Sequence, residues 1–115
     1  MVVNLNEELA GFYGTEQYHK LSPLHPFVVT DGIKAMCEIA QCYWLMDVAA
    51  SYQEKLENEP FQVWGVKLTD DKKGYVYCNN GNRKELVRQE LNYTDFPHDY
   101  EFYLIDGVTL LKSEY

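Results

Sequence analysis

The sequence lacks the features that would assign it to a membrane or to a secreted, disulfide-bonded class. No apolar run reaches the length of a membrane span, and no signal peptide precedes Leu5. Cys37, Cys42 and Cys78 show neither a pairing pattern nor the spacing of metal ligands. We therefore expect a soluble cytoplasmic protein with reduced cysteines, no membrane association and no metal.

Motifs for catalysis are also missing. No serine lies in a nucleophile elbow, and Cys37 and Cys42 have no basic neighbour that would lower a thiol pKa. Gly11 and Gly14 are not followed by the lysine of a phosphate-binding loop. The sequence therefore predicts a protein that is not an enzyme and has no cofactor.

Basic residues are few: 10 Lys and Arg stand against 18 Asp and Glu, which gives a formal net charge of -8. Direct binding of nucleic acid needs a basic surface that displaces counterions from phosphates, so this mode is not expected. A charged partner would instead be a protein with a basic surface. The acidity also fits a role in solubility alone.

The stretch that can nucleate a core runs from Thr30 to Tyr52, where apolar and small residues recur with helical spacing. Thr30 or Asp31 can cap its start, and Pro60 closes its end. We predict a long helix from Asp31 to Asn58, kinked near Gln41 because an unbroken helix would exceed the usual length.

The remaining chain predicts a short helix before the long one and strands after it. The first helix is expected over Asn4 to Phe12, with Asn4 or Asn6 as its cap. Alternating patterns predict strands at Phe61–Leu68, Gly74–Cys78, Leu86–Tyr93, Tyr100–Ile105 and Val108–Lys112. This order indicates a single α+β domain over residues 1–115, with one short and one long helix packed on one face of a four- or five-stranded antiparallel meander.

Two groups of residues are candidates for a polar pocket or a metal site. Asp47 lies on the apolar stripe beside Trp44, and Asp95 with His98 could orient an imidazole, so Trp44, Asp47, Asp95 and His98 form one candidate pocket. The structural alternative is that both aspartates cap loops or turns. His19, His25 and Asp31 match no known ligand pattern, so a metal site is not predicted.

Ten tyrosines suggest an interaction surface, because a rigid amphipathic ring buries area at low entropic cost. Interleaved with acids, they predict an acidic, aromatic face made of Tyr75, Tyr77, Glu90, Asp95, Asp99, Tyr100 and Glu101. The alternative is that many of the rings fill the core with only the hydroxyl at its rim.

Short pieces spread over nearly the whole chain resemble a family of small uncharacterised proteins of bacteria and their phages, a domain of unknown function. The pieces are GTE-x-Y from Gly14, TDG from Thr30, YWL-x-D from Tyr43, YTDFP from Tyr93 and the SEY that closes the sequence. The resemblance carries no activity or catalytic residue. It implies a phage or mobile-element setting, in which small proteins often bind and inactivate a host protein.

Three hypotheses for function follow. The first is a non-enzymatic protein that binds and inhibits a host protein, in a nucleic-acid-handling or defence complex, through the acidic tyrosine face. The second is a small-ligand-binding domain or minor enzyme with its pocket near Asp47 and His98. The third is a homodimer formed by an exposed sheet edge at Val108–Lys112.

Overall fold

The computed structural model describes residues 3–82 and 84–115 and contains one mixed sheet with helices on one side. The helices are α1 (Leu5–Glu8), α2 (Asp31–Ala40) and α3 (Tyr43–Ser51), and a 3-10 turn, η1, spans Lys112–Glu114. The strands are β1 (Tyr18–His19), β2 (Val28–Thr30), β3 (Phe61–Asp70), β4 (Lys73–Asn79), β5 (Glu85–Leu91), β6 (Tyr100–Ile105) and β7 (Val108–Leu111).

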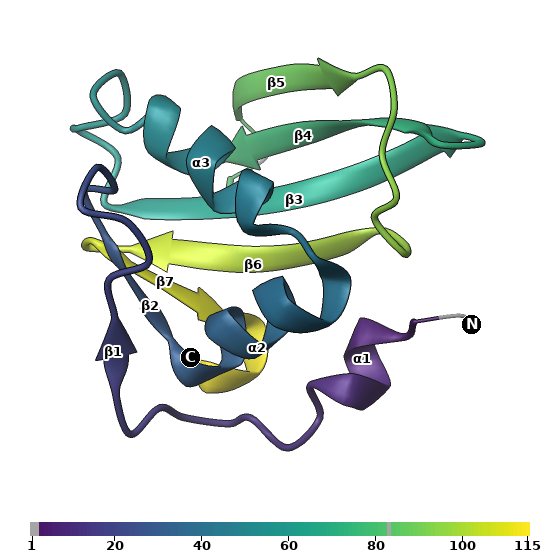
Figure 1. The fold of residues 1–115 in the computed structure, drawn as a ribbon. Coiled ribbons are helices and arrows are strands. Elements are labelled where there is room, and N and C mark those ends of the chain that lie inside the picture. Colours follow the sequence, from purple (N-terminus) through teal and green to yellow (C-terminus); the bar gives the residue numbers. More distant parts are fainter. Residues whose placement is uncertain (1–2, 83) are drawn as a thin grey trace.

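The seven strands lie in the order β1-β2-β7-β6-β3-β4-β5 (Figure 1). All neighbours are antiparallel except β2 and β7, which run parallel with Val28 opposite Val108. The expected four- or five-stranded antiparallel meander is therefore wrong. β3, β4 and β5 form consecutive antiparallel pairs, but β6 returns to the other side of β3, and β7 lies between β6 and the N-terminal strand β2.

The two N-terminal strands account for part of this error, and the return of β6 to the free side of β3 accounts for the rest. β1 and β2 contain two and three residues, which is too short for an alternating pattern to stand out in the sequence. Val29 is fully buried because β2 lies between β1 and β7 inside the sheet. The predicted free edge at Val108–Lys112 is wrong for the same reason: β2 pairs with β7 on that side, so β7 is not an edge strand.

The long helix from Asp31 to Asn58 is also wrong, because the chain forms two shorter helices. Thr30 caps α2, with its hydroxyl accepting from the Ile33 amide at 3.3 Å. Gln41 then adopts a left-handed conformation with φ 52°, which ends α2 where the kink was expected. α3 ends at Ser51, and turns rather than helix lead to Pro60.

The first helix is shorter than expected as well. α1 is a single turn, Leu5–Glu8, capped by Asn4, whose side-chain oxygen accepts from the Glu7 amide at 3.2 Å. Leu5 and Leu9 are buried and anchor this turn to the core.

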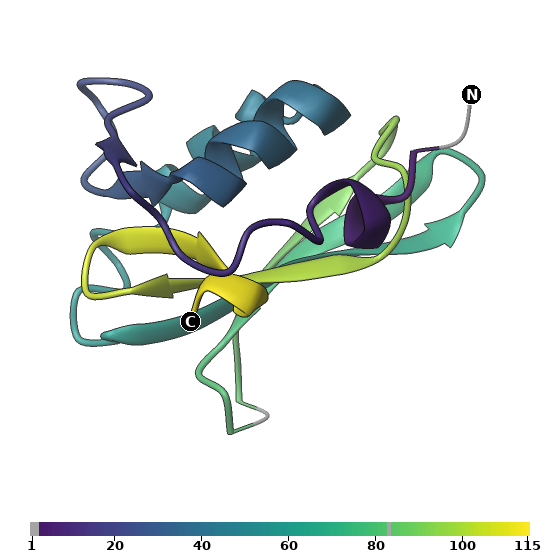
Figure 2. The ribbon, with the colours of Figure 1, turned by 90° about the horizontal axis from the view of Figure 1, so that it is seen from below.

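The core lies between the sheet and the helices α2 and α3 (Figure 2). Its largest fully buried side chains include Trp64 on β3 and Phe102 on β6, opposite Ile33 and Met36 from α2. Full burial of such a side chain contributes about 1.5–3 kcal/mol, so this layer supplies most of the driving force for folding.

The opposite face of the sheet, which we call the open face, carries no α-helix in the described part of the chain (Figure 2). Because side chains alternate along a strand, the residues between the core positions point to it. Tyr75 and Tyr77 lie between the buried Gly74, Val76 and Cys78 of β4 and are only half-buried. The open face is therefore a sheet surface that the helices leave uncovered.

Candidate interaction face

Aromatic rings gather at the β3 and β6 end of the open face. The Phe61 and Tyr103 ring centroids are 5.2 Å apart, and the Tyr115 ring lies 6.2 Å from the first and 5.4 Å from the second. The rings meet in tilted and edge-on geometries, which are the favourable ones for aromatic pairs. Tyr115 is 77% exposed, so the cluster remains accessible.

A second aromatic group lies on β4. The Tyr75 and Tyr77 centroids are 6.0 Å apart, and the Arg88 guanidinium sits over the Tyr75 ring at 3.7 Å. The Tyr77 ring lies across Gly65 of β3: a Cβ added to this glycine would come within 2.4 Å of the ring. Glycine at position 65 thus allows the tyrosine to lie flat and reach Glu101 on the next strand.

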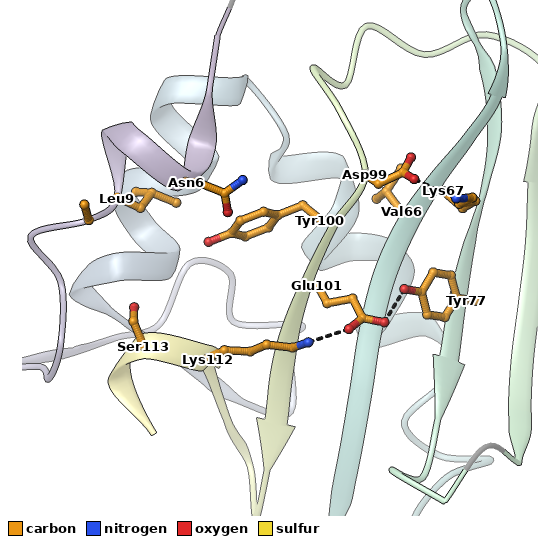
Figure 3. A pocket seen from close by; sticks show the side chains of 11 residues that line it. Asn6, Leu9, Val66, Lys67, Tyr77, Asp99, Tyr100, Glu101, Lys112 and Ser113 are labelled. Atoms are coloured by element: carbon orange, nitrogen blue, oxygen red, sulfur yellow. Dashed lines mark hydrogen bonds and ion pairs between the residues drawn. The ribbon is translucent and has the colours of Figure 1, made fainter.

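Glu101 is the polar centre of the open face (Figure 3). Its carboxylate accepts hydrogen bonds from the Tyr77 hydroxyl and the Lys112 ammonium. Burial opposes ionisation of Glu101, but the bonds from Lys112 and Tyr77 outweigh it and lower the pKa of the carboxyl. Burial, followed by the bond to the carboxylate, raises the pKa of the Tyr77 phenol, so this hydroxyl stays a proton donor.

A cavity of about 480 Å³ opens beside this centre. β7 ends at Leu111 opposite Phe102, so Tyr100 and Glu101 have no β7 neighbour, and α1 closes the other side of the gap. Its lining combines apolar side chains with two lysines and two carboxylates, from Asn6, Leu9, Ala10, Val66, Lys67, Tyr77, Asp99, Tyr100, Glu101, Lys112 and Ser113 (Figure 3).

The four acids of the expected interaction surface are each paired with a base. Lys112 pairs with Glu101, Lys67 with Asp99 at 2.8 Å, and Lys72 with Asp95 at 2.8 Å. The Arg88 and Glu90 side chains are 3.7 Å apart. These bases make the face nearly neutral rather than acidic, although the molecule as a whole carries a net charge of -8.

The structure distributes the expected interaction residues over three places. Tyr75, Tyr77, Glu90 and Glu101 lie on the open face, whereas Asp95 and Asp99 flank its end in the connector before β6. Tyr100 has the parity of the core residues of β6, and burial, followed by the charge of Glu114, raises the pKa of its phenol.

Sequence reasoning missed the Phe61 and Lys112 members of this face. For Phe61 the signal was present, since this residue alternates with the buried Gln62 and Trp64 along β3.

The expected pocket does not assemble as one site. Trp44 and Asp95 line a shallow cavity of about 350 Å³ with Gln41, Leu91, Tyr93 and Thr94. Asp47 lies elsewhere, 72% exposed, and accepts from His25 Nε2 at 2.7 Å. His98 accepts from the Leu5 amide through Nε2 at 2.9 Å and donates through Nδ1 to the Asp99 carbonyl.

The three histidines likewise go to three separate places. His19 pairs with Asp31 at 2.7 Å, and this bond, helped by the Glu16 amide, lowers the pKa of the aspartate. His25 is buried against Phe27, and its Nδ1 has no partner among the described residues. Within residues 3–82 and 84–115, no group of three His, Cys, Asp or Glu side chains could hold a metal ion.

Several motif residues meet at the start of α2, where the Glu114 carboxylate lies. One of its oxygens accepts from the Thr30 hydroxyl at 2.6 Å and the Leu111 amide at 2.9 Å, and the other accepts from the Gly32 amide at 3.1 Å. Beside this carboxylate, the Thr15 hydroxyl accepts a hydrogen bond from the Asp31 amide at 2.9 Å. The TDG and SEY motifs therefore form a structural junction.

Among the described residues, no helix has both the length and the apolar character needed to cross a bilayer. The three cysteines are free thiols buried in the core. Burial raises the pKa of Cys78 to about 12, and the contact with Cys42, followed by burial, raises that of Cys37. Neither of these two thiols is activated as a nucleophile.

Comparison with known proteins places the chain in a family. The family model described as a family of unknown function (DUF6876) matches residues 3–115, so the chain belongs to this family. No curated protein and no solved structure matches it.

Proposed function

We propose that this protein is a non-enzymatic interaction protein of phage or mobile-element type that binds a host protein with a basic surface and inhibits it by steric occlusion. The observation that supports this proposal is the open face: a sheet surface without a helix, on which Tyr75, Tyr77 and Tyr103 stand half-buried.

The open face supplies the contact. Its tyrosine rings are held by neighbouring side chains, Tyr77 by Glu101 and Tyr75 by Arg88, so little side-chain entropy is lost when a partner covers them. Tyrosine and arginine are also the residues that contribute most to binding when they are enclosed by an interface.

The negative charge of the rest of the molecule attracts the basic partner as the two proteins approach each other. The acids of the open face are paired, and further negative charge is carried by exposed residues elsewhere, such as Glu38 on α2 and Glu54 and Glu57 in the turns after α3. The field of a net charge of -8 accelerates encounter with a basic protein and is screened by salt. Binding should therefore weaken as ionic strength rises.

The proposal is tested by retention of proteins from a lysate of the host cell at low and high salt, with the retained protein identified, purified and assayed directly. The informative variant is Tyr75→Ser combined with Tyr103→Ser on the open face. The matched control is Tyr43→Ser at the start of α3, because Tyr43 is 43% exposed on the helical side.

The proposal predicts one partner retained by the wild type and by the control, with affinity at least about tenfold weaker for the double variant. The purified partner should also lose activity when the wild-type protein is added. Equal binding of all three proteins, or no retained partner, would refute the role of the open face.

A second candidate function is small-ligand binding, favoured by the cavity beside Glu101. Its volume of about 480 Å³ lies within the range of ligand sites, and its lysines and carboxylates could hold a zwitterionic molecule. A ligand that raises the melting temperature of the wild type but not of Lys112→Met would support this function. A screen of amino acids and related zwitterions without such a shift would exclude it for that class.

A further inference from the structure

The sheet has one long edge strand, β5. It pairs with β4 on one side and has no neighbour on the other side in the described part of the chain. The opposite edge, β1, contains only two residues, whereas β5 spans the seven residues Glu85–Leu91. Figure 1 shows β5 at the border of the molecule, with no helix lying along its outer side.

Strands at a sheet edge offer unpaired backbone groups, and proteins usually protect them with proline, charged side chains (lysine above all), a bulge or a covering element. β5 contains neither proline nor lysine, and its charged side chains, Glu85, Arg88 and Glu90, are of both signs. Its Val87 is buried, and Leu86 and Leu91 are partly buried against the core. The strand is thus suited to pair with a further strand.

The side chains of β5 divide cleanly between the two faces. Val87, Gln89 and Leu91 point to the helical side, where Gln89 accepts from the Tyr52 hydroxyl at 2.9 Å. Arg88 and Glu90 stand on the open face, with side chains 48% and 66% exposed. Both charged groups are therefore available to a strand placed alongside.

We infer that β5 pairs antiparallel with β5 of a second copy of this chain, about a two-fold axis at Gln89. In this register Arg88 stands opposite Glu90 of the second copy, and the symmetry repeats the pair. Val87 stands opposite Leu91, again twice, and Gln89 faces its own equivalent. Opposite charges and apolar residues thus meet directly across the new pair, which is the favourable arrangement in antiparallel sheets.

Neighbouring registers lack this complementarity. A two-fold axis between antiparallel strands keeps each open-face residue opposite an open-face residue. Moving the axis by one residue in one direction puts Arg88 opposite Arg88, and moving it in the other direction puts Glu90 opposite Glu90. Like charges directly opposite each other are destabilising, so the charges select the register centred on Gln89.

The dimer joins the two sheets into one continuous sheet and responds to salt in its own way. Each copy carries a net charge of -8, so the copies repel each other at long range. Salt screens this repulsion more than the close contacts, and self-association should strengthen with ionic strength. This is opposite to the salt dependence of the proposed partner complex.

Charge reversal provides the test, by sedimentation of the full chain over a range of protein concentrations. Wild type should pass from a mass of 13.5 kDa to twice that value. Arg88→Glu and Glu90→Arg should each weaken self-association about tenfold or more, because both create two like-charge pairs. An equimolar mixture of these two variants should associate, since both cross-strand pairs are then of opposite sign.

Circular dichroism and melting temperature show whether each variant is folded. If Arg88→Glu unfolds after losing its contact with Tyr75, Glu90→Arg gives the same test, because it keeps this contact and still creates two like-charge pairs. A monomeric wild type at all concentrations, or single variants that associate as strongly as wild type, would overturn the inference.

Discussion

Replacing Glu114 by glutamine tests the junction between the SEY motif and the start of α2. The Glu114 carboxylate accepts three hydrogen bonds, from Thr30, Gly32 and Leu111, and lies at the positive end of the α2 dipole. Glutamine keeps one oxygen but turns an NH₂ group toward a donor. A charge-assisted hydrogen bond contributes about 1.5–3 kcal/mol, so the expected loss of unfolding free energy is about 2 kcal/mol.

The corresponding change in melting temperature can be measured by calorimetry. An unfolding entropy of about 2.1 cal/mol/K per residue gives roughly 0.24 kcal/mol/K for 115 residues, so the midpoint should fall by roughly 8 °C. Glu16→Gln is the matched control, because it changes the net charge equally at an exposed side chain. Its midpoint should stay within roughly 2 °C of wild type.

Gly32→Ala extends the test. A Cβ at this position would lie 2.6 Å from Glu114 Oε1 and 2.6 Å from Leu111 Cδ1, so alanine must displace the carboxylate. The two substitutions therefore damage the same contact, and the double variant should lose less stability than the sum of the single losses. A Glu114→Gln protein that melts with the wild type, or strict additivity, would refute the capping role.

Three further predictions concern other polar contacts. Asp47→Ala leaves the buried His25 imidazole without its partner and should lower the unfolding free energy by about 1–3 kcal/mol in urea, whereas an unchanged midpoint would show the pair to be dispensable. Gly65→Ala should displace the Tyr77 ring, seen as a changed near-ultraviolet circular dichroism spectrum and a lower melting temperature. The lowered pKa of the Asp31 carboxyl stabilises the folded state at pH values above its ordinary pKa of 3.8, and this contribution is lost as the pH falls through the pKa of the folded state. Asp31→Asn should therefore lose less stability than wild type on acidification to pH ~2.

Local patterns in the sequence were enough to predict the five C-terminal strands, although not their order in the sheet. Asp106 and Gly107 both adopt positive φ, as a tight hairpin turn requires, and the strand expected at Tyr100–Ile105 has those bounds. The break near Gln41 could also be predicted, because an unbroken helix from Asp31 to Asn58 would exceed the usual length of a helix. The position where α3 ends could not, because the polar tail after Ser51 is as compatible with helix as with turns.

These local patterns could not predict contacts between segments that are far apart in the sequence. β2 is three residues long, and its partner β7 lies 80 residues further along the chain, with Val28 opposite Val108. The same limit applies to the candidate site. The spacing of Asp95 and His98 gave no indication that one would pair with Lys72 and the other would accept from the Leu5 amide.

The place of β7 in the sheet constrains the order in which this protein can be made. β7 lies between β2 and β6, yet it leaves the ribosome after all the other strands that the structure describes. Until it emerges, β1 and β2 have no sheet to join and the start of α2 lacks the Glu114 carboxylate. The nascent chain can therefore pair β3 with β4, β5 and β6 during synthesis, but native structure at its N-terminus must wait until β7 and Glu114 have emerged.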